Sequence, residues 1–453
     1  MTRTVAAQTV VVGAGPVGSL LALLLARRGH QVIVYESRPD PRRLPAPPGR
    51  SINLTLAERG WHALRAVDAD AAVHEICVPL YGRMIHSPYG ACAFQPYTSR
   101  HDAIYSASRT ELTDLLLEMV RAHPAVRIHF DHRCLEPDFA GRRLHLLGPG
   151  GVTTTVAARH VFAADGAWST VRRGLLRAHG GSFFQRLSPM LYRELRVPRS
   201  GLTGDLARRE ALHLWPRGQC MLVGFPNLDG SATVSVFMPL TGEESFAALT
   251  TPPELTRFLL SECPDLLAAS PALVEDFFAR PPSLLVSSSC RPWIHEDWLA
   301  LVGDAAHALV PFLGQGLNAG FEDCTVLLEC IEESGGDWHA ALRRYEQDRT
   351  ANCETVIQLA EQHYDELAVR ARDPLFRVRK WLEDRAYRLD PDRFVPLYTM
   401  VAFSRRPYTE VRCRQARQEE MLDRLMKHPA IRAREVGGHV DALIRDELAQ
   451  LAG

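Results

Sequence analysis

Residues 9–36, TVVVGAGPVGSLLALLLARRGHQVIVYE, decide the fold of this chain. The first four are β-branched and mostly apolar, which predicts a buried strand. Residues 19–28 predict a helix, and residues 31–35 predict a second buried strand. The turn between the first strand and the helix carries three glycines in the spacing G-x-G-x-x-G, namely Gly13, Gly15 and Gly18. The segment therefore predicts a βαβ unit with a glycine-rich turn.

This βαβ unit predicts a dinucleotide site. A glycine-rich turn lets the backbone approach a pyrophosphate closely, and the helix N-terminus favours the negative charge. Glu36 follows 18 residues after the third glycine, where an acid accepts hydrogen bonds from a ribose. The alternative is a glycine-rich turn without a ligand. The motif alone does not separate NAD from FAD, but no second G-x-G-x-x-G follows a predicted strand, so separate FAD and NADPH domains are not expected.

Length and composition limit the class of protein. The chain has 453 residues, 46% hydrophobic and 23% charged, which predicts two or three structural units with a large core. Its 52 basic and 53 acidic residues argue against nucleic-acid binding. The apolar run 9–26 could suggest a membrane span or signal peptide, but the glycine turn interrupts it, so we expect a soluble, cytoplasmic protein. Ten cysteines without C-x-x-C or zinc-finger spacing predict free thiols and no metal site.

Two later segments also suggest nucleotide contacts. Residues 161–173 read VFAADGAWSTVRR, and residues 298–318 read WLALVGDAAHALVPFLGQGLN. In each, an apolar strand ends at an aspartate, Asp165 or Asp304, which can accept a hydrogen bond from a ribityl hydroxyl. The glycines after residue 313 open a helix whose N-terminus can face a flavin, which becomes negative on reduction.

Together, the three segments resemble the FAD-dependent aromatic hydroxylases of the p-hydroxybenzoate hydroxylase type, over residues 9 to about 330. The resemblance implies that Asp304 contacts the ribityl chain or pyrophosphate and that Asp165 belongs to a turn serving flavin and nicotinamide coenzyme. It also implies that Arg109 contacts the flavin nucleotide and that Leu317 and Asn318 lie against the isoalloxazine ring. The residues predicted to bind FAD are Gly13, Gly15, Val17, Gly18, Glu36, Arg38, Thr55, Arg109, Asp165, Asp304, Gly316, Leu317 and Asn318.

A narrower resemblance covers nearly the whole chain. The segments that carry it are GRSINL (49–54), YGRMIH (81–86), VPFLGQGLNAGFEDC (310–324) and PLYTMVAF (396–403). In this order they resemble the kynurenine 3-monooxygenase family. The resemblance implies that the guanidinium of Arg83 holds the substrate carboxylate, with Tyr97 and Tyr398 beside it. It also implies that Phe312 lines the aromatic pocket and that Gln315 hydrogen-bonds the substrate ketone or a flavin hydroperoxide.

One segment departs from the family pattern. Where the family has Asn-Tyr-x-Glu-Met-Arg with a substrate-contacting asparagine, residues 363–368 read HYDELA. His363 is therefore either a substrate-binding residue in a reshaped pocket or a solvated helix residue, and a ring-substituted kynurenine fits the first reading. For His307, which follows Asp304 closely, we expect a structural hydrogen bond rather than a role as a base.

The resemblance implies NADPH-dependent hydroxylation of L-kynurenine, or a ring-substituted kynurenine, to the 3-hydroxy product. FAD would be the cofactor, O2 and NADPH the co-substrates, and a flavin C4a-hydroperoxide the oxygen donor. One alternative is a single-component flavin monooxygenase acting on another aromatic acid or amino acid. Others are a flavin dehydrogenase or oxidase and a non-catalytic nucleotide-binding sensor. The sequence leaves open NADPH against NADH, and the oligomeric state.

The predicted fold class is α/β (α+β), with three interleaved parts. Residues 1–75, 100–180 and 280–330 are expected to form a Rossmann-like FAD-binding domain. Residues 76–99 and 181–279 contain alternating apolar runs that predict a mixed or antiparallel sheet for the substrate. Residues 331–453 show helical periodicity and predict a C-terminal helical region.

Overall fold

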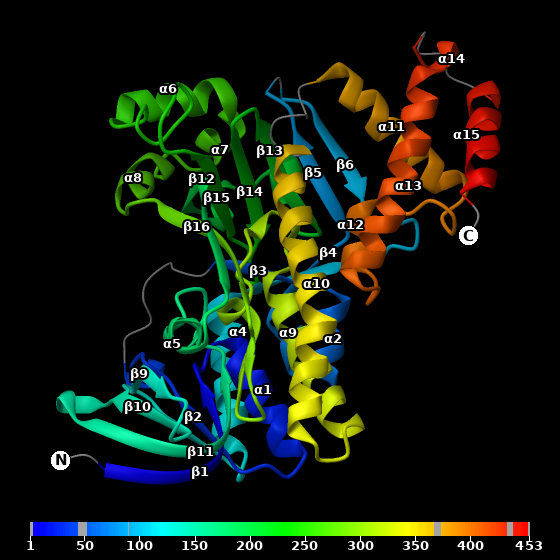
Figure 1. The fold of residues 1–453 in the computed structure, drawn as a ribbon. Coiled ribbons are helices and arrows are strands. Elements are labelled where there is room, and N and C mark those ends of the chain that lie inside the picture. Colours follow the sequence, from blue (N-terminus) through cyan, green and yellow to red (C-terminus); the bar gives the residue numbers. More distant parts are fainter. Residues whose placement is uncertain (1–2, 44–51, 89, 367–372, 433–437, 452–453) are drawn as a thin grey trace.

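The computed structural model describes residues 3–43, 52–88, 90–366, 373–432 and 438–451. Parts of two predicted segments, residues 49–51 and 367–368, lie outside this range. The chain folds around three sheets and a group of C-terminal helices (Figure 1). The predicted α/β class with a C-terminal helical region is confirmed.

The first sheet has a parallel centre. Along its main path the order is β17-β18-β11-β1-β2-β8, and off this path β10 pairs antiparallel with β11 and β9 pairs antiparallel with β10. Its strands are β1 (Arg3–Val12), β2 (Val32–Tyr35), β8 (Val126–His129), β9 (Arg133–Asp138), β10 (Arg143–Leu147), β11 (Thr153–Ala163), β17 (Ile294–His295) and β18 (Leu299–Leu301). The predicted βαβ unit is confirmed, since helix α1 (Pro16–Arg27) connects the parallel neighbours β1 and β2.

The second sheet has seven strands and is mostly antiparallel, in the order β16-β12-β15-β14-β13-β5-β6. Its strands are β5 (Gly82–His86), β6 (Cys92–Pro96), β12 (Ser182–Val197), β13 (Ala211–Arg217), β14 (Cys220–Pro226), β15 (Ala232–Pro239) and β16 (Ser283–Arg291). A third sheet, of β3 (Asn53–Leu56), β7 (Ile104–Ser108) and β4 (Cys77–Leu80), lies between the two larger ones. Strand β16 extends the second sheet past residue 280, where we expected the FAD-binding domain to resume, because it pairs with the long strand β12.

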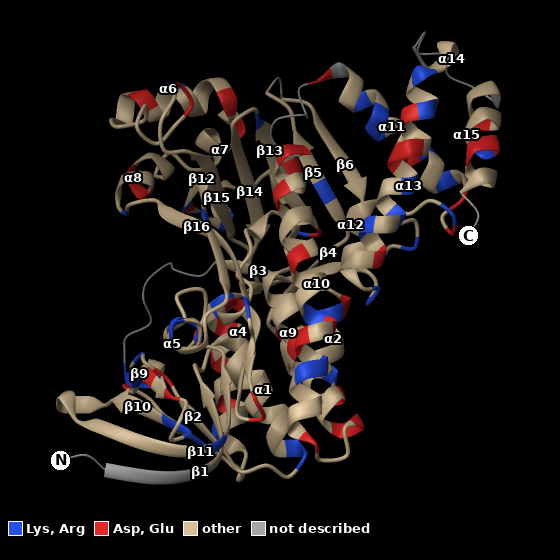
Figure 2. Cartoon of the chain, viewed as in Figure 1, with Lys and Arg blue, Asp and Glu red and all other residues tan. Residues whose placement is uncertain are grey.

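The helices complete the layers. Those before residue 335 are α1, α2 (Glu58–Arg65), α3 (Asp70–Glu75), α4 (Arg109–Ala122), α5 (Thr170–His179), α6 (Pro252–Glu262), α7 (Pro264–Ala269), α8 (Leu273–Phe278) and α9 (Gly316–Glu333). The C-terminal helices are α10 (Trp338–Tyr364), α11 (Pro374–Leu389), α12 (Leu397–Ala402), α13 (Tyr408–Lys427), α14 (Pro429–Arg432) and α15 (Gly438–Gln450). Charges of both signs alternate along α13, as expected for a solvated helix face (Figure 2).

Helix α10 joins the two halves of the molecule. Its first turns bury Leu342 and Tyr345 in the core of the first sheet, and its last turns bury Val356 and Leu359 in the core of the second sheet. The helices after it add a third, smaller core. One helix thus packs into both cores and connects the two sheets. Within the described ranges, no helix has the length and apolar character needed to cross a membrane.

Candidate active site

A cavity of about 740 Å³ lies where the first sheet faces the second. On one side it is lined by the carboxyl ends of β1, β2 and β11, where ligands bind in open parallel sheets. On the other side it is lined by β13, β14 and β15 of the second sheet. Fourteen of the predicted site residues line it: Gly13, Gly15, Val17, Glu36, Arg38, Thr55, Arg83, Arg109, Asp165, Asp304, Phe312, Gly316, Leu317 and Tyr398.

The glycine-rich turn is packed closely on one side and open on the other. A side chain at Gly13, whose φ is +100°, would place its Cβ 2.4 Å from the carbonyl oxygen of Ala164, and one at Gly18 would meet the carbonyl of Gly13 at 2.0 Å. A Cβ at Gly15 would meet no atom within 4 Å, because this residue borders the cavity. The turn therefore leaves free backbone at the N-terminus of α1, where a pyrophosphate fits.

Glu36 lies buried at the end of β2. Its carboxylate accepts hydrogen bonds from the Ala14 amide at 2.7 Å and from Nε of Arg38 at 2.8 Å. Burial alone would raise the pKa of Glu36, but these donors outweigh burial and hold the pKa below its ordinary value. Glu36 is thus an ionised acceptor next to the glycine turn, as a ribose contact requires.

The wall formed by the second sheet is apolar. Cross-strand neighbours present their side chains to the same face, so that the cavity meets rows of aliphatic and aromatic groups. Phe312, from the loop before α9, closes this wall and packs edge-to-face on Phe237 at 5.3 Å between ring centroids. The wall consists of Leu212, Leu214, Met221, Val223, Phe225, Phe237 and Phe312. Such a surface suits an aromatic ring and holds few ordered waters.

Four polar side chains meet at the end of this wall. The Arg83 guanidinium lies over the rings of Tyr398, at 4.2 Å, and Tyr97, at 5.6 Å, and its Nη2 is 3.2 Å from Nε2 of His363. The two tyrosine rings stack at 5.0 Å. Arg83 and Tyr398 are half-buried and line the cavity, whereas Tyr97 and His363 are buried and do not. We call these four residues the head-group cluster.

The head-group cluster is assembled from four separate segments. Arg83 comes from β5, Tyr97 follows β6, His363 is near the end of α10, and Tyr398 is in α12. The hydroxyl of Thr399 donates to the Tyr97 carbonyl at 2.9 Å and fixes α12 against that strand. His363 is only 5% exposed, so the reading of it as a solvated helix residue is wrong.

The sequence as a whole is similar to proteins named kynurenine 3-monooxygenase. It is 38% identical to a kynurenine 3-monooxygenase of Flavobacterium johnsoniae over 92% of this chain and 93% of that protein. It is 40% identical to a kynurenine 3-monooxygenase of Salinispora arenicola over 92% of each chain. A model of the FAD binding domain matches residues 6–205 and 237–360. The chain belongs to the kynurenine 3-monooxygenase family.

Solved structures agree with the fold of this family member. A 2-methyl-3-hydroxypyridine-5-carboxylic acid oxygenase superimposes with a TM-score of 0.66, over 83% of this chain and 94% of the other, at 21% identity. The p-nitrophenol 4-monooxygenase PnpA of Pseudomonas putida superimposes with a TM-score of 0.65, over 99% and 98%, at 20% identity. The kynurenine 3-monooxygenase relatives and the FAD binding domain identify the protein as an FAD-dependent aromatic monooxygenase of the p-hydroxybenzoate hydroxylase type, and these structures agree in fold.

The donors and acceptors around the cavity fit FAD. Oδ2 of Asp165 accepts from the amides of Thr170 and Val171 and fixes the start of α5, while its buried Oδ1 has no partner in the described part of the chain. Burial raises the pKa of Asp165, so a hydrogen-bond donor from a ligand would be favourable there. Asp304 and Arg109 face the same cavity. An unpaired buried acceptor, an open glycine turn and an ionised Glu36 are the features that an FAD site needs.

Asn318 and Gly18 differ from the other predicted FAD residues, because neither lines the cavity. The Asn318 side chain is fully buried, donates to the carbonyls of Thr55 and Gly314, and accepts from the Ala57 amide. It thereby clamps the end of β3 against the loop before α9. Gly18 permits the close contact between α1 and its own turn. Both residues therefore support the backbone around the site without lining the cavity.

Gln315 also points away from the cavity. Its side chain is 2% exposed, and its Oε1 accepts a hydrogen bond from the Tyr408 hydroxyl at 2.9 Å. The contact of Gln315 with the substrate ketone or a flavin hydroperoxide stays a prediction, and it would have to compete with this hydrogen bond. Tyr408, on α13, is a partner that the sequence pattern does not reveal.

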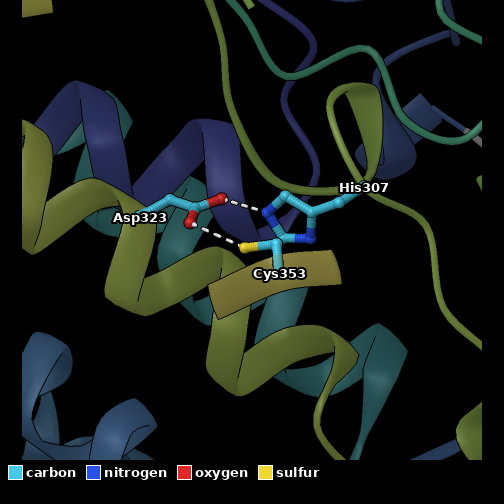
Figure 3. A group of neighbouring side chains, drawn as sticks. All are labelled: His307, Asp323 and Cys353. Carbon is cyan, nitrogen blue, oxygen red and sulfur yellow. Dashed lines mark hydrogen bonds and ion pairs between the residues drawn. The ribbon is translucent and has the colours of Figure 1, made fainter. Parts of the chain in front are cut away.

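Beneath the site lies a buried ionic network that the sequence analysis missed. His307 pairs with Asp323 through Nε2 at 2.5 Å, as expected for a structural histidine, although the partner is not Asp304 (Figure 3). Arg349 binds the other oxygen of Asp323 at 2.7 Å and Glu322 at 2.6 Å, and Arg59 binds Glu322 at 3.0 Å. The two adjacent acids in the helix predicted after Gly316 are the one feature of the sequence that could have indicated this network.

The group His307, Asp323 and Cys353 has donor atoms that are close enough for a metal ion (Figure 3). Arg349 already occupies the Asp323 carboxylate and lies 3.6 Å from the Cys353 sulfur, so a guanidinium fills the position of a cation. Burial alone would lower the pKa of His307, but Asp323 raises it well above its ordinary value. The arrangement is a buried ion-pair network that fixes the turn at Gly303, whose amide donates to Asp323.

Proposed function

We propose that this enzyme hydroxylates L-kynurenine, or a ring-substituted kynurenine, at carbon 3, with FAD as cofactor and O2 and NADPH as co-substrates. The observation that carries the proposal is the head-group cluster at one end of an apolar cavity whose other end is a glycine turn. The family membership of the chain supports the same substrate.

The cluster has unused donors suited to a carboxylate. Among the described residues, the buried Nε of Arg83 has no hydrogen-bond partner, and the buried hydroxyl of Tyr97 has none outside the cluster. Arginine side chains carry only donors, and burial raises the pKa of Tyr97 well above its ordinary value, so its hydroxyl keeps its proton. Leaving such groups unpaired costs about 1–3 kcal/mol each, which a ligand carboxylate would recover. The α-carboxylate of kynurenine is such an acceptor.

The cavity wall positions the aromatic ring and excludes water. Phe312 and the side chains of β13 to β15 surround the space between the head-group cluster and the glycine turn. Bound FAD, once reduced by NADPH, supplies the oxygen activation. The aniline amino group makes the neighbouring ring carbon electron-rich, so the protein is asked to orient the ring and keep the site dry rather than to provide a strong base.

The test is NADPH oxidation by the purified yellow protein with and without L-kynurenine, with the product identified by mass. We expect strong stimulation and a product heavier by one oxygen. Stimulation that yields hydrogen peroxide alone would exclude plain kynurenine as the substrate and favour a ring-substituted one. Bound FAD without any response to kynurenine would overturn the substrate assignment.

A further inference from the structure

His363 contacts the head-group cluster through one nitrogen. Its Nε2 lies 3.2 Å from Nη2 of Arg83, and every polar atom of a guanidinium is a donor. Nε2 must therefore offer its lone pair, which places the ring proton on Nδ1. The buried Nδ1 atom has no partner among the residues that the structure describes, so within them the contact with Arg83 is the hydrogen bond that fixes the ring. The ring is also stacked on Tyr398 at 5.8 Å.

The surroundings of His363 favour its uncharged form. Burial is the largest cause that lowers its pKa well below the ordinary value, followed by the charges of Arg83 on β5 and Lys380 on α11. Lys380 is itself paired with Glu366 and Glu383. Tyr398 on α12 faces the same ring, and burial raises its pKa, so it stays neutral. The ring thus has a free lone pair where Arg83 needs an acceptor.

We propose that His363 is a positioning residue: its uncharged Nε2 holds the Arg83 guanidinium in the orientation that receives the substrate carboxylate. The inference rests on the proposed function and assigns His363 an action through Arg83 rather than a contact with the substrate. Without this acceptor, Arg83 would keep its contacts with Tyr97 and Tyr398 but would lose the ring nitrogen that fixes Nη2. The affected quantity is then the affinity for the carboxylate, not the chemistry on the ring.

Two substitutions at this position distinguish the contribution of the lone pair from that of the ring. His363→Gln keeps an oxygen acceptor near the place of Nε2, whereas His363→Phe keeps a ring for Tyr398 but has no acceptor. We expect His363→Phe to raise the KM for L-kynurenine about tenfold with kcat nearly unchanged, and His363→Gln to restore most of the affinity. An ortho-aminophenyl ketone without a carboxylate should bind equally well to all three proteins, as followed by the change in flavin absorbance.

Equal losses for kynurenine and the ketone in His363→Phe would overturn the proposal, because they would mean general damage to the pocket. Failure of kynurenine to bind the unsubstituted enzyme would instead count against the proposed function. In that case, ¹⁵N-histidine NMR of the substrate-free holoenzyme tests the role of His363, whose signal is identified by its loss in His363→Gln. A neutral ring protonated on Nδ1, with that preference lost in Arg83→Ala, supports the proposal, and a doubly protonated ring at pH 7 contradicts it.

Discussion

The two ends of the cavity are built differently. The end at the glycine turn uses backbone and small residues from a few short stretches of sequence: Gly13 and Gly18 make close contacts, and Gly15 stays open. The head-group cluster uses four large side chains from four segments, and buried donors such as Nε of Arg83 have no partner within the described ranges. The first end is thus encoded locally, and the second exists only when distant parts of the chain have packed together.

This difference predicts how substitutions at each end of the cavity should act. Steric changes in the backbone turn should impair FAD binding and folding together. Changes in the head-group cluster should alter the affinity for the amino-acid substrate and leave FAD bound. The buried ionic network connects the two ends, because Asp323 holds the Gly303 amide while Arg59 binds the Val401 carbonyl at the end of the Tyr398 helix.

The largest effect is expected for the network. Asp323→Asn removes the charge that faces His307 and Arg349 and leaves two buried cations without a full partner. Removing one member of a buried ion pair costs about 3–5 kcal/mol in the free energy of unfolding. Urea unfolding of the holoenzyme measures this change in the free energy of unfolding. Asp348→Asn, at an exposed pair with Arg344, is the control and should change stability by about 0.5 kcal/mol or less. If the two substitutions destabilised the protein equally, the role of the network would be refuted.

A smaller effect, confined to the substrate, is expected for Arg83→Ala. Loss of the guanidinium should weaken kynurenine binding by about 2–5 kcal/mol while the FAD content stays the same. The measurement is the KM for kynurenine together with the ratio of flavin to protein. Arg196→Ala, at an exposed pair on β12 of the same sheet, should leave both unchanged. If Arg83→Ala also lost FAD, the two ends could not be regarded as separate.

The glycine turn provides a matched pair of substitutions. In Gly18→Ala the new methyl group meets the Gly13 carbonyl, so the turn must shift, at a cost of about 1–3 kcal/mol in stability, and FAD should be lost. In Gly15→Ala the methyl group enters the open cavity, so the apoprotein should keep its stability while FAD binds more weakly. Apoprotein unfolding and FAD titration measure both. If the two variant apoproteins were equally stable, the argument that Gly18 is closely packed and Gly15 is not would be contradicted.

The smallest effect is a pH dependence at the head-group end. The folded protein holds His363 uncharged, whereas the unfolded chain binds a proton near pH 6.5, so the unfolded state takes up more protons below that pH. Stability should therefore fall as the pH drops below 6.5, by at most about 1.4 kcal/mol per pH unit from this residue. His363→Gln should flatten the curve between pH 6.5 and 5.5. His213, also buried, with its pKa lowered to about 4, contributes in both proteins and cancels in the comparison.

Much of the first sheet and several strands of the second could be predicted from sequence. The strand at 9–12 and the helix at 19–28 are confirmed, and the alternating apolar runs expected within residues 181–279 include β13, β14 and β15, because buried strands and helices have characteristic periods. The placement of β16 in the second sheet could not be predicted, since pairing with β12 depends on long-range register. Nor could the burial of the Gln315 side chain, whose partner is the Tyr408 hydroxyl on α13.

The sequence by itself determined the βαβ unit, the glycine turn and the acid at its second strand, because each depends on neighbours within a few residues. Through resemblance it also indicated which residues to expect near a flavin and a substrate carboxylate. Only the tertiary structure decided that Arg83 and His363 share a hydrogen bond, that Tyr97 stacks on Tyr398, and that Asp323 lies beneath the site. These contacts join residues up to 300 positions apart, and the packing of α10 and α12 against the second sheet, rather than any local preference, brings them together.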